Sequence, residues 1–229
     1  MKIHVKERLV LSKSIKRLLC RVIVLLLIIE FVSPGLFIAY EAEAADNTPP
    51  PSIFEKTYGS GLSGEEAYDV VVNSLGGYAF VGSSYENGKY QALITITDKD
   101  GNETDRRIYS YNNFSRTELR SIDTIENDPV NPGYITAGLT QGNINSKKRM
   151  YVLRTNSYGQ KIWEYTYGFD GGSWQMCQAF SVKETKDLGF IVAGCVQYNN
   201  QTDLYLVKLD RDGNKLWERT FGASIIWEW

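Results

Sequence analysis

Histidine is almost absent from this sequence, and its scarcity limits the chemistry that the chain could perform. The single histidine, His4, lies near the start, so residues 46–229 contain no imidazole. This excludes a Ser-His-Asp triad, a Cys-His pair and a histidine metal site there. Basic residues are not in excess either. Of 25 Lys and Arg, seven lie in residues 1–45, against four of 27 Asp and Glu, so the remainder is mildly acidic. No nucleic-acid-binding surface is expected.

Long apolar runs are confined to residues 1–45, where they predict export. A basic stretch precedes the run "VIVLLLII" at Val22–Ile29, and small residues follow at Ala42–Ala44. This layout is typical of an export signal cleaved near Ala44, and an uncleaved N-terminal membrane anchor is the alternative. Both place the rest of the chain outside the cytoplasm, secreted or at the cell envelope or surface. Membrane contact is expected only through this segment, if it is uncleaved, and residues 46–51 form a Pro-rich linker.

Cysteine is also scarce, with three residues in the whole chain. Cys20 precedes the apolar run instead of closing it, so a lipid-modified cysteine is not expected. Cys177 and Cys195 remain in the exported part, where an oxidising compartment would permit a disulfide. If they lie on paired strands, the turn near Asp187 places them about three residues out of register. A disulfide and two buried thiols both stay open.

Internal repetition is the strongest signal in the sequence. One series of hexapeptides aligns without gaps, although its second member has lost the aromatic residue and the glycine: "FEKTYG" (54–59), "DRRIYS" (105–110), "WEYTYG" (163–168) and "WERTFG" (217–222). A second series is "GGYAFVG" (76–82), "PGYITAG" (132–138) and "LGFIVAG" (188–194). A third is "LITITDKDGN", "VLRTNSYGQ" and "YLVKLDRDGN", which end at 102, 160 and 214. The three series run in step.

The residue pattern within each unit predicts four short strands, because β-branched and aromatic runs alternate with Gly, Asp and Asn turns. In the third unit the strands are "AFSVKET", "GFIVAGCV", "DLYLVKLD" and "KLWERTFG". Both alternating faces of "LYLVKL" at 204–209 are largely apolar, so the sheet is expected to be covered on both sides. The small pairs Val81-Gly82, Ala137-Gly138 and Ala193-Gly194 suit strands that a neighbour approaches closely.

Repeated four-stranded antiparallel units predict an all-β fold of β-propeller-like blades. The approximate units are 60–111, 112–168 and 169–222, with partial units at 52–59 and 223–229. Three full blades are fewer than the usual four to eight. We therefore expect either an incomplete, truncated propeller or a homo-oligomer that completes the ring. The motifs W-x-x-T-[YF]-G, GG[YF]-x-x-[VA]-G and YLVKLD-x-DGN-x-x-W resemble the repeats of secreted prokaryotic β-propeller proteins, mostly uncharacterised, and the resemblance covers residues 52–229.

The Asp-Gly turns invite comparison with calcium loops, and their spacing argues against one. In "DKDGN" and "DRDGN" the glycine comes fourth, whereas a helix-loop-helix calcium loop has glycine sixth and a distant Glu. The copy "TNSYGQ" keeps the glycine and lacks both carboxylates, which favours a turn. No metal or cofactor is therefore expected. The pair Glu65-Glu66 is interpreted as part of a solvated polar loop.

The aromatic residues recur at repeat positions and are expected to be core residues first. Trp174 differs, because the other complete units have no tryptophan in that connecting loop, and it is the candidate for ligand contact. The favoured function is an exported, non-enzymatic binding or interaction module with a protein or glycan ligand. The alternatives are a secreted carbohydrate hydrolase or lyase that uses Asp and Glu, and a structural spacer from a larger surface protein.

Overall fold

The computed structural model describes residues 55–59, 64–143, 145–168, 174–198 and 200–222. The expected export segment and the linker lie outside these residues. Residues 52–229 form one compact unit, and the following description concerns that unit.

The described chain is all-β, with twelve strands and a single 3₁₀ turn at Tyr111–Asn113. Most strands match a β-branched or aromatic run of the sequence, and the turns between them match Gly, Asn or Asp clusters. The strands are β1 (Gly64–Val72), β2 (Tyr78–Glu86), β3 (Lys89–Thr97), β4 (Glu103–Tyr109), β5 (Arg116–Ile125), β6 (Gly133–Gln141), β7 (Arg149–Asn156), β8 (Lys161–Tyr167), β9 (Trp174–Glu184), β10 (Phe190–Tyr198), β11 (Gln201–Leu209) and β12 (Lys215–Phe221).

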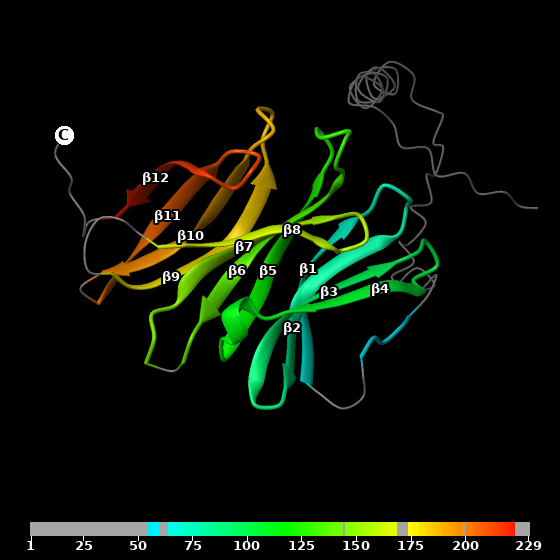
Figure 1. Cartoon of the computed structure of the whole chain (residues 1–229), viewed down its shortest axis with the longest axis horizontal. Helices are drawn as coiled ribbons and strands as arrows, with labels where there is room; N and C mark the ends of the chain where they lie inside the picture. Colours follow the sequence, from blue (N-terminus) through cyan, green and yellow to red (C-terminus); the bar gives the residue numbers. More distant parts are fainter. Residues whose placement is uncertain (1–54, 60–63, 144, 169–173, 199, 223–229) are drawn as a thin grey trace, which may run out of the picture. The chain divides into compact units, whose positions relative to one another are not determined.

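Three antiparallel meanders of four strands follow one another along the chain (Figure 1). We call β1–β4 the first unit, β5–β8 the second and β9–β12 the third. A single parallel pair, Tyr90 with Arg116, joins the first two units into one eight-stranded sheet. The isolated parallel bridge between Lys148 and Met176 lies at the corresponding place between the second and third units.

The first strand of each later unit packs on its predecessor: β5 against β1, β2 and β3, and β9 against β5, β6 and β7. Two apolar clusters result, one between the first and second units and one between the second and third. Strand β6 of the second unit is accordingly buried on both faces. The third unit differs from expectation, because Tyr205 and Val207 are fully buried while Leu204, on the opposite face, is 66% exposed. Among the described residues, the face of β11 that contains Leu204 is covered only in part.

The first strand of every unit contains a β-bulge that the sequence did not reveal. The extra residues are Tyr68, Arg120 and Phe180, each opposite one of the small-residue pairs of the second strand. The bulge directs a backbone carbonyl at the glycine, so a Cβ on Gly138 would overlap the carbonyl oxygen of Glu118. The small pairs were expected to mark a close approach, and the approaching strand is the bulged neighbour in the same sheet.

The Asp-Gly turns are closed by their own first residue. In the third unit, Asp210 Oδ1 accepts hydrogen bonds from the backbone N–H groups of Asp212 (2.9 Å) and Asn214 (2.8 Å). Asp98 binds the first turn in the same way, and Asn156 replaces it in the second. The glycine of each turn has a positive φ, which explains why glycine is kept where the carboxylates are not.

Candidate functional site

A cleft of about 500 Å³ opens where the first and second units meet, at the turns that follow β1 and β5. Its apolar wall is formed by valine, isoleucine, proline and tyrosine, and its polar groups are hydroxyls, amides and carboxylates. The lining residues are Val72, Asn73, Ser74, Thr124, Ile125, Glu126, Asp128, Pro129, Pro132, Gly133, Tyr134 and Ser157. A concave site with apolar walls and a few fixed polar groups is the usual form of a small-ligand site.

The wall from the first unit is a tight turn that Asn73 organises. Its Oδ1 accepts hydrogen bonds from the N–H groups of Leu75 (3.0 Å) and Gly77 (2.9 Å), and its Nδ2 donates to the Thr97 carbonyl (3.1 Å). Both ends of the amide are therefore engaged. The turn presents the exposed Ser74 to the cleft on a fixed backbone.

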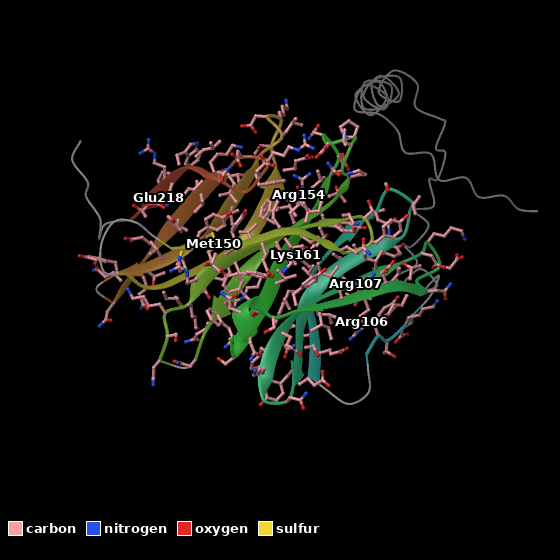
Figure 2. All side chains as sticks on the ribbon, in the orientation of Figure 1. Arg106, Arg107, Met150, Arg154, Lys161 and Glu218 are labelled. Atoms are coloured by element: carbon pink, nitrogen blue, oxygen red, sulfur yellow. The ribbon has the colours of Figure 1, made fainter. Side chains whose placement is uncertain are left out.

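The wall from the second unit is a longer, Pro-containing loop anchored by Asp128. Asp128 Oδ2 lies 2.6 Å from Arg154 Nη2 and 2.6 Å from Arg211 Nη2. Its Oδ1 accepts hydrogen bonds from the N–H groups of Val130 and Asn131, both at 3.2 Å. The side chains of Asp128 and Arg154 are each only 3% exposed. This network fixes the loop, and Figure 2 labels Arg154 where the second unit meets the orange ribbon of the third.

Charge and burial act in opposite directions on Asp128. Burial by itself would raise the pKa of its carboxyl group, but the hydrogen bond from Arg154, the two backbone N–H groups and the Arg211 charge lower it below the usual value. Asp128 is therefore a carboxylate at neutral pH. Its oxygens already bind two guanidinium groups and two amides, so it positions the loop instead of acting as a free acid or base.

Tyr134 connects the two walls of the cleft. Burial raises the pKa of its phenol to about 12, and a hydrogen bond with Asn73 partly offsets this effect. The hydroxyl therefore stays protonated at neutral pH. In the wall from the second unit, Thr124 Oγ1 donates a hydrogen bond to Glu126 Oε1 at 3.2 Å. The cleft thus offers hydroxyl, amide and carboxylate groups beside proline and tyrosine surfaces.

The corresponding position between the second and third units holds a protein carboxylate. Glu184, the last residue of β9, has the register position of Thr124 in β5, because the two pair with the equivalent residues Phe190 and Tyr134. Glu184 Oε2 accepts hydrogen bonds from the N–H groups of Glu126 (2.9 Å) and Asn127 (3.1 Å), and from Asn127 Nδ2 (2.7 Å). The shorter Thr124 instead donates its hydroxyl hydrogen to Glu126, and it makes no bond of this kind to the part of the first unit that the structure describes. Because threonine stands where the third unit has glutamate, the space that the Glu184 side chain occupies at the second junction stays open at the first.

The candidate residue Trp174 is the first residue of β9. Its side chain lies outside what the structure describes, so ligand contact by Trp174 stays a prediction.

Cys177 and Cys195 are both free and buried. Cys177 is paired with Val196 and Cys195 with Gln178, so the cysteines are one residue out of register and their side chains leave opposite faces of the sheet. The expected offset of about three residues was wrong, because the pairing next to the turn already gives an offset of two and the bulge at Phe180 reduces it to one. Burial raises the pKa of the Cys177 thiol to about 12, which keeps it protonated and unreactive.

The pair Glu65-Glu66 lies on β1, and the expected polar loop was wrong. The strand was not recognised in the sequence because two adjacent charged residues precede the apolar part of β1. Glu65 forms an ion pair with Arg106 of β4, and Glu66 accepts a hydrogen bond from the Tyr68 hydroxyl at 2.5 Å. Their side chains point to opposite faces of the strand, which does not suit a pair of cooperating catalytic carboxylates.

Sequence reasoning missed Asp128 and Arg154, although one signal was present. When the third repeat series is aligned on its turns, Arg154 occupies the position of Ile96 and Lys208. Lys208 likewise binds the turn after its own first strand, through Thr185 Oγ1 (2.8 Å) and Asp187 Oδ1 (2.9 Å). A charged residue within an otherwise apolar series indicated a buried ion pair.

Within the described residues, no helix is long and apolar enough to cross a membrane. The same part of the chain contains no group of three or more His, Cys, Asp or Glu side chains that could hold a metal ion. Neither a protein-family model nor a curated protein matches the chain.

Proposed function

We propose that this chain is an exported, non-enzymatic β-propeller-like repeat protein that acts as a binding module at the cell surface or envelope. Export rests on the layout of residues 1–45. The propeller-like character is supported by three successive four-stranded meanders with equivalent packing. The observation that carries the binding role is the cleft between the first and second units, whose walls are fixed by Asn73 and Asp128.

The chemistry of the cleft favours a short glycan as ligand. A volume of about 500 Å³ lies in the range of small-molecule sites. The exposed apolar surfaces of Pro129 and Pro132 suit the C–H faces of a sugar ring, and the amide, hydroxyl and carboxylate groups suit its hydroxyls. The lining residues of the cleft include no Lys or Arg, and the nearby Arg154 and Arg211 are paired with Asp128, so the cleft presents no cation for an acidic ligand.

A glycan array probed with the full-length protein and with Ser74→Trp tests this proposal. Ser74 is exposed at the rim, so an indole at this position would fill the cleft without disturbing the core. We expect the wild type to bind a limited set of glycans and Ser74→Trp to lose that binding at least tenfold.

The matched control is Leu75→Trp, because Leu75 lies in the same turn, is almost fully exposed and does not line the cleft. It should bind as the wild type does. Absence of glycan binding by the wild type, or equal binding by both tryptophan variants, would contradict the proposed site. Release of a sugar product by the wild type would instead favour the hydrolase alternative.

A further inference from the structure

In the first and second units, the last strand is held by the glycine-containing turn between the third and fourth strands of the following unit. Tyr109 of β4 donates a hydrogen bond to the carbonyl of Gly159, and Tyr167 of β8 donates one to the carbonyl of Gly213 at 2.6 Å. Trp163 of β8 adds an indole N–H bond to the carbonyl of Arg211 at 3.2 Å. The contact therefore recurs at both junctions within the chain.

The segment Glu55–Gly59 makes the same contact with the first unit, although it precedes β1. Tyr58 donates its hydroxyl hydrogen to the carbonyl of Gly101 at 2.8 Å, and its ring lies 5.1 Å from that of Phe80. Lys56 Nζ donates to the carbonyl of Asp100 at 2.8 Å and to Asn102 Oδ1 at 2.6 Å. This segment thus stands where the last strand of a preceding unit would lie.

Strand β12 presents the same motif with no turn of this kind docked on it among the described residues. "FEKTYG" at 54–59 aligns with "WERTFG" at 217–222, so Phe221 corresponds to Tyr58 and Arg219 to Lys56. Trp217 is 43% exposed and Phe221 is 53% exposed, whereas Tyr167, the equivalent of Phe221 in the second unit, is only 8% exposed. Leu204 is paired with Phe221 and extends the apolar surface.

We infer that β12 of one copy docks on the first unit of a second copy, in the place held by Glu55–Gly59, and that this segment is a displaceable cap. The repeat identifies the occupant, because the turn Asp98–Asn102 has the hydrogen bonds of the turn that receives Trp163 and Tyr167. A second copy supplies both this turn and the strand that fits it. The inference concerns assembly and does not depend on glycan binding.

The cap holds the advantage in the resting chain for two reasons. It is tethered to the unit that it covers, so its effective concentration is high. Phe221 also lacks the hydroxyl with which Tyr58 binds the Gly101 carbonyl, so the contact between copies lacks that hydrogen bond. Docking of β12 on a different surface is a heterologous contact, which produces head-to-tail chains or closed rings.

Light scattering coupled to size exclusion of the full-length protein tests this inference. Lys56→Ala/Tyr58→Ala removes the hydrogen bonds of the cap, and we expect its molar mass to rise with concentration well above that of the wild type. Adding Trp217→Ala/Phe221→Ala should restore the wild-type mass, because it removes the docking strand. Equal masses for all three proteins, or a rise that the second pair of substitutions leaves unchanged, would overturn the inference.

A labelled peptide of sequence KLWERTFG provides a second measurement that does not need assembly. Titration followed by fluorescence anisotropy measures its affinity for each protein. We expect the peptide to bind Lys56→Ala/Tyr58→Ala at least tenfold more tightly than the wild type, in which the cap competes for the same site. The peptide KLAERTAG is the matched control and should bind neither protein. Circular dichroism of each variant verifies the β fold. Failure of KLWERTFG to bind the folded uncapped protein would overturn the inference.

Discussion

Asp128→Asn should lower the free energy of unfolding by about 3 kcal/mol, because it removes the charge from a buried ion pair. The carboxylate lies 2.6 Å from the guanidinium groups of both Arg154 and Arg211. The new amide would leave Arg154, which is only 3% exposed, with a less favourable partner. Arg154 also donates to the carbonyl of Arg211 at 2.9 Å, so the change affects the junction of the second and third units. Urea denaturation followed by circular dichroism measures the loss.

The effect should depend on pH in a definite direction. The folded-state pKa of Asp128 is lowered, so its contribution to stability is present above the unfolded pKa of about 3.9 and is lost as pH falls through the folded value. The stability difference between the wild type and Asp128→Asn should therefore be constant near neutrality. It should shrink below about pH 4.

Asp100→Asn is the matched control for this substitution. Asp100 pairs with Lys99 at 2.7 Å, but both side chains are more than half exposed, and such surface pairs contribute little. Its stability should stay within about 0.5 kcal/mol of the wild type. If Asp128→Asn were equally mild, the anchoring role of the Asp128 network would be refuted.

Gly138→Ala should also destabilise the protein strongly, by about 3 kcal/mol. A Cβ at this position would overlap the carbonyl oxygen of Glu118 and lie 2.9 Å from the Cα of Leu119. Both atoms belong to the backbone of the bulged strand β5, so no side-chain rotation could relieve the overlap. The bulge at Arg120 or the pairing of β5 with β6 would have to change. Thermal and urea denaturation measure the effect.

Gly64→Ala provides the comparison, because a Cβ on Gly64 meets nothing within 4 Å. Its effect on stability should be close to zero, since no atom has to move and alanine also reduces the entropy of the unfolded chain. Equal stability of the Gly138→Ala and Gly64→Ala proteins would show that the bulge does not require glycine.

The repeat and its strands could be predicted because their signals are local. Turn residues such as Asn73, Asp98 and Asp210 close their own turns, and the glycine of each Asp-Gly turn takes a positive φ that few other residues adopt. Apolar alternation between the turns then defines the strands. The all-β fold followed from these features without information on distant contacts.

The bulges could not be predicted, because nothing in Tyr68, Arg120 or Phe180 marks an extra residue. They have different side chains, and what they share is their place opposite a small-residue pair. The bulge at Phe180, together with the register at the turn before it, is also why the relative position of the two buried cysteines was predicted incorrectly. Register beyond a bulge depends on pairing with the next strand, which the sequence of one strand does not contain.

The cleft was beyond sequence reasoning for a similar reason. It arises where two turns from different units meet, and its anchor combines Asp128, Arg154 and Arg211 from three separate segments. Arg154 could have been noticed as a charge in an apolar series, but its partner lay in a loop that is longer than the corresponding turns of the other two units. The exposed face of the third unit was missed because the alternation in "LYLVKL" of β11 predicts apolar faces and does not say which of them is covered.

Amide hydrogen exchange tests most directly the central claim that three units pack in series, with the second covered on both faces. Strand β6 is buried along nearly its whole length, whereas β12 alternates between exposed and half-buried residues. We expect the amides of Gly133–Gln141 to exchange most slowly and those of β12 to exchange fastest among the paired strands. Slower exchange in β10 and β11 than in β6, or uniform exchange across the units, would contradict this order of packing.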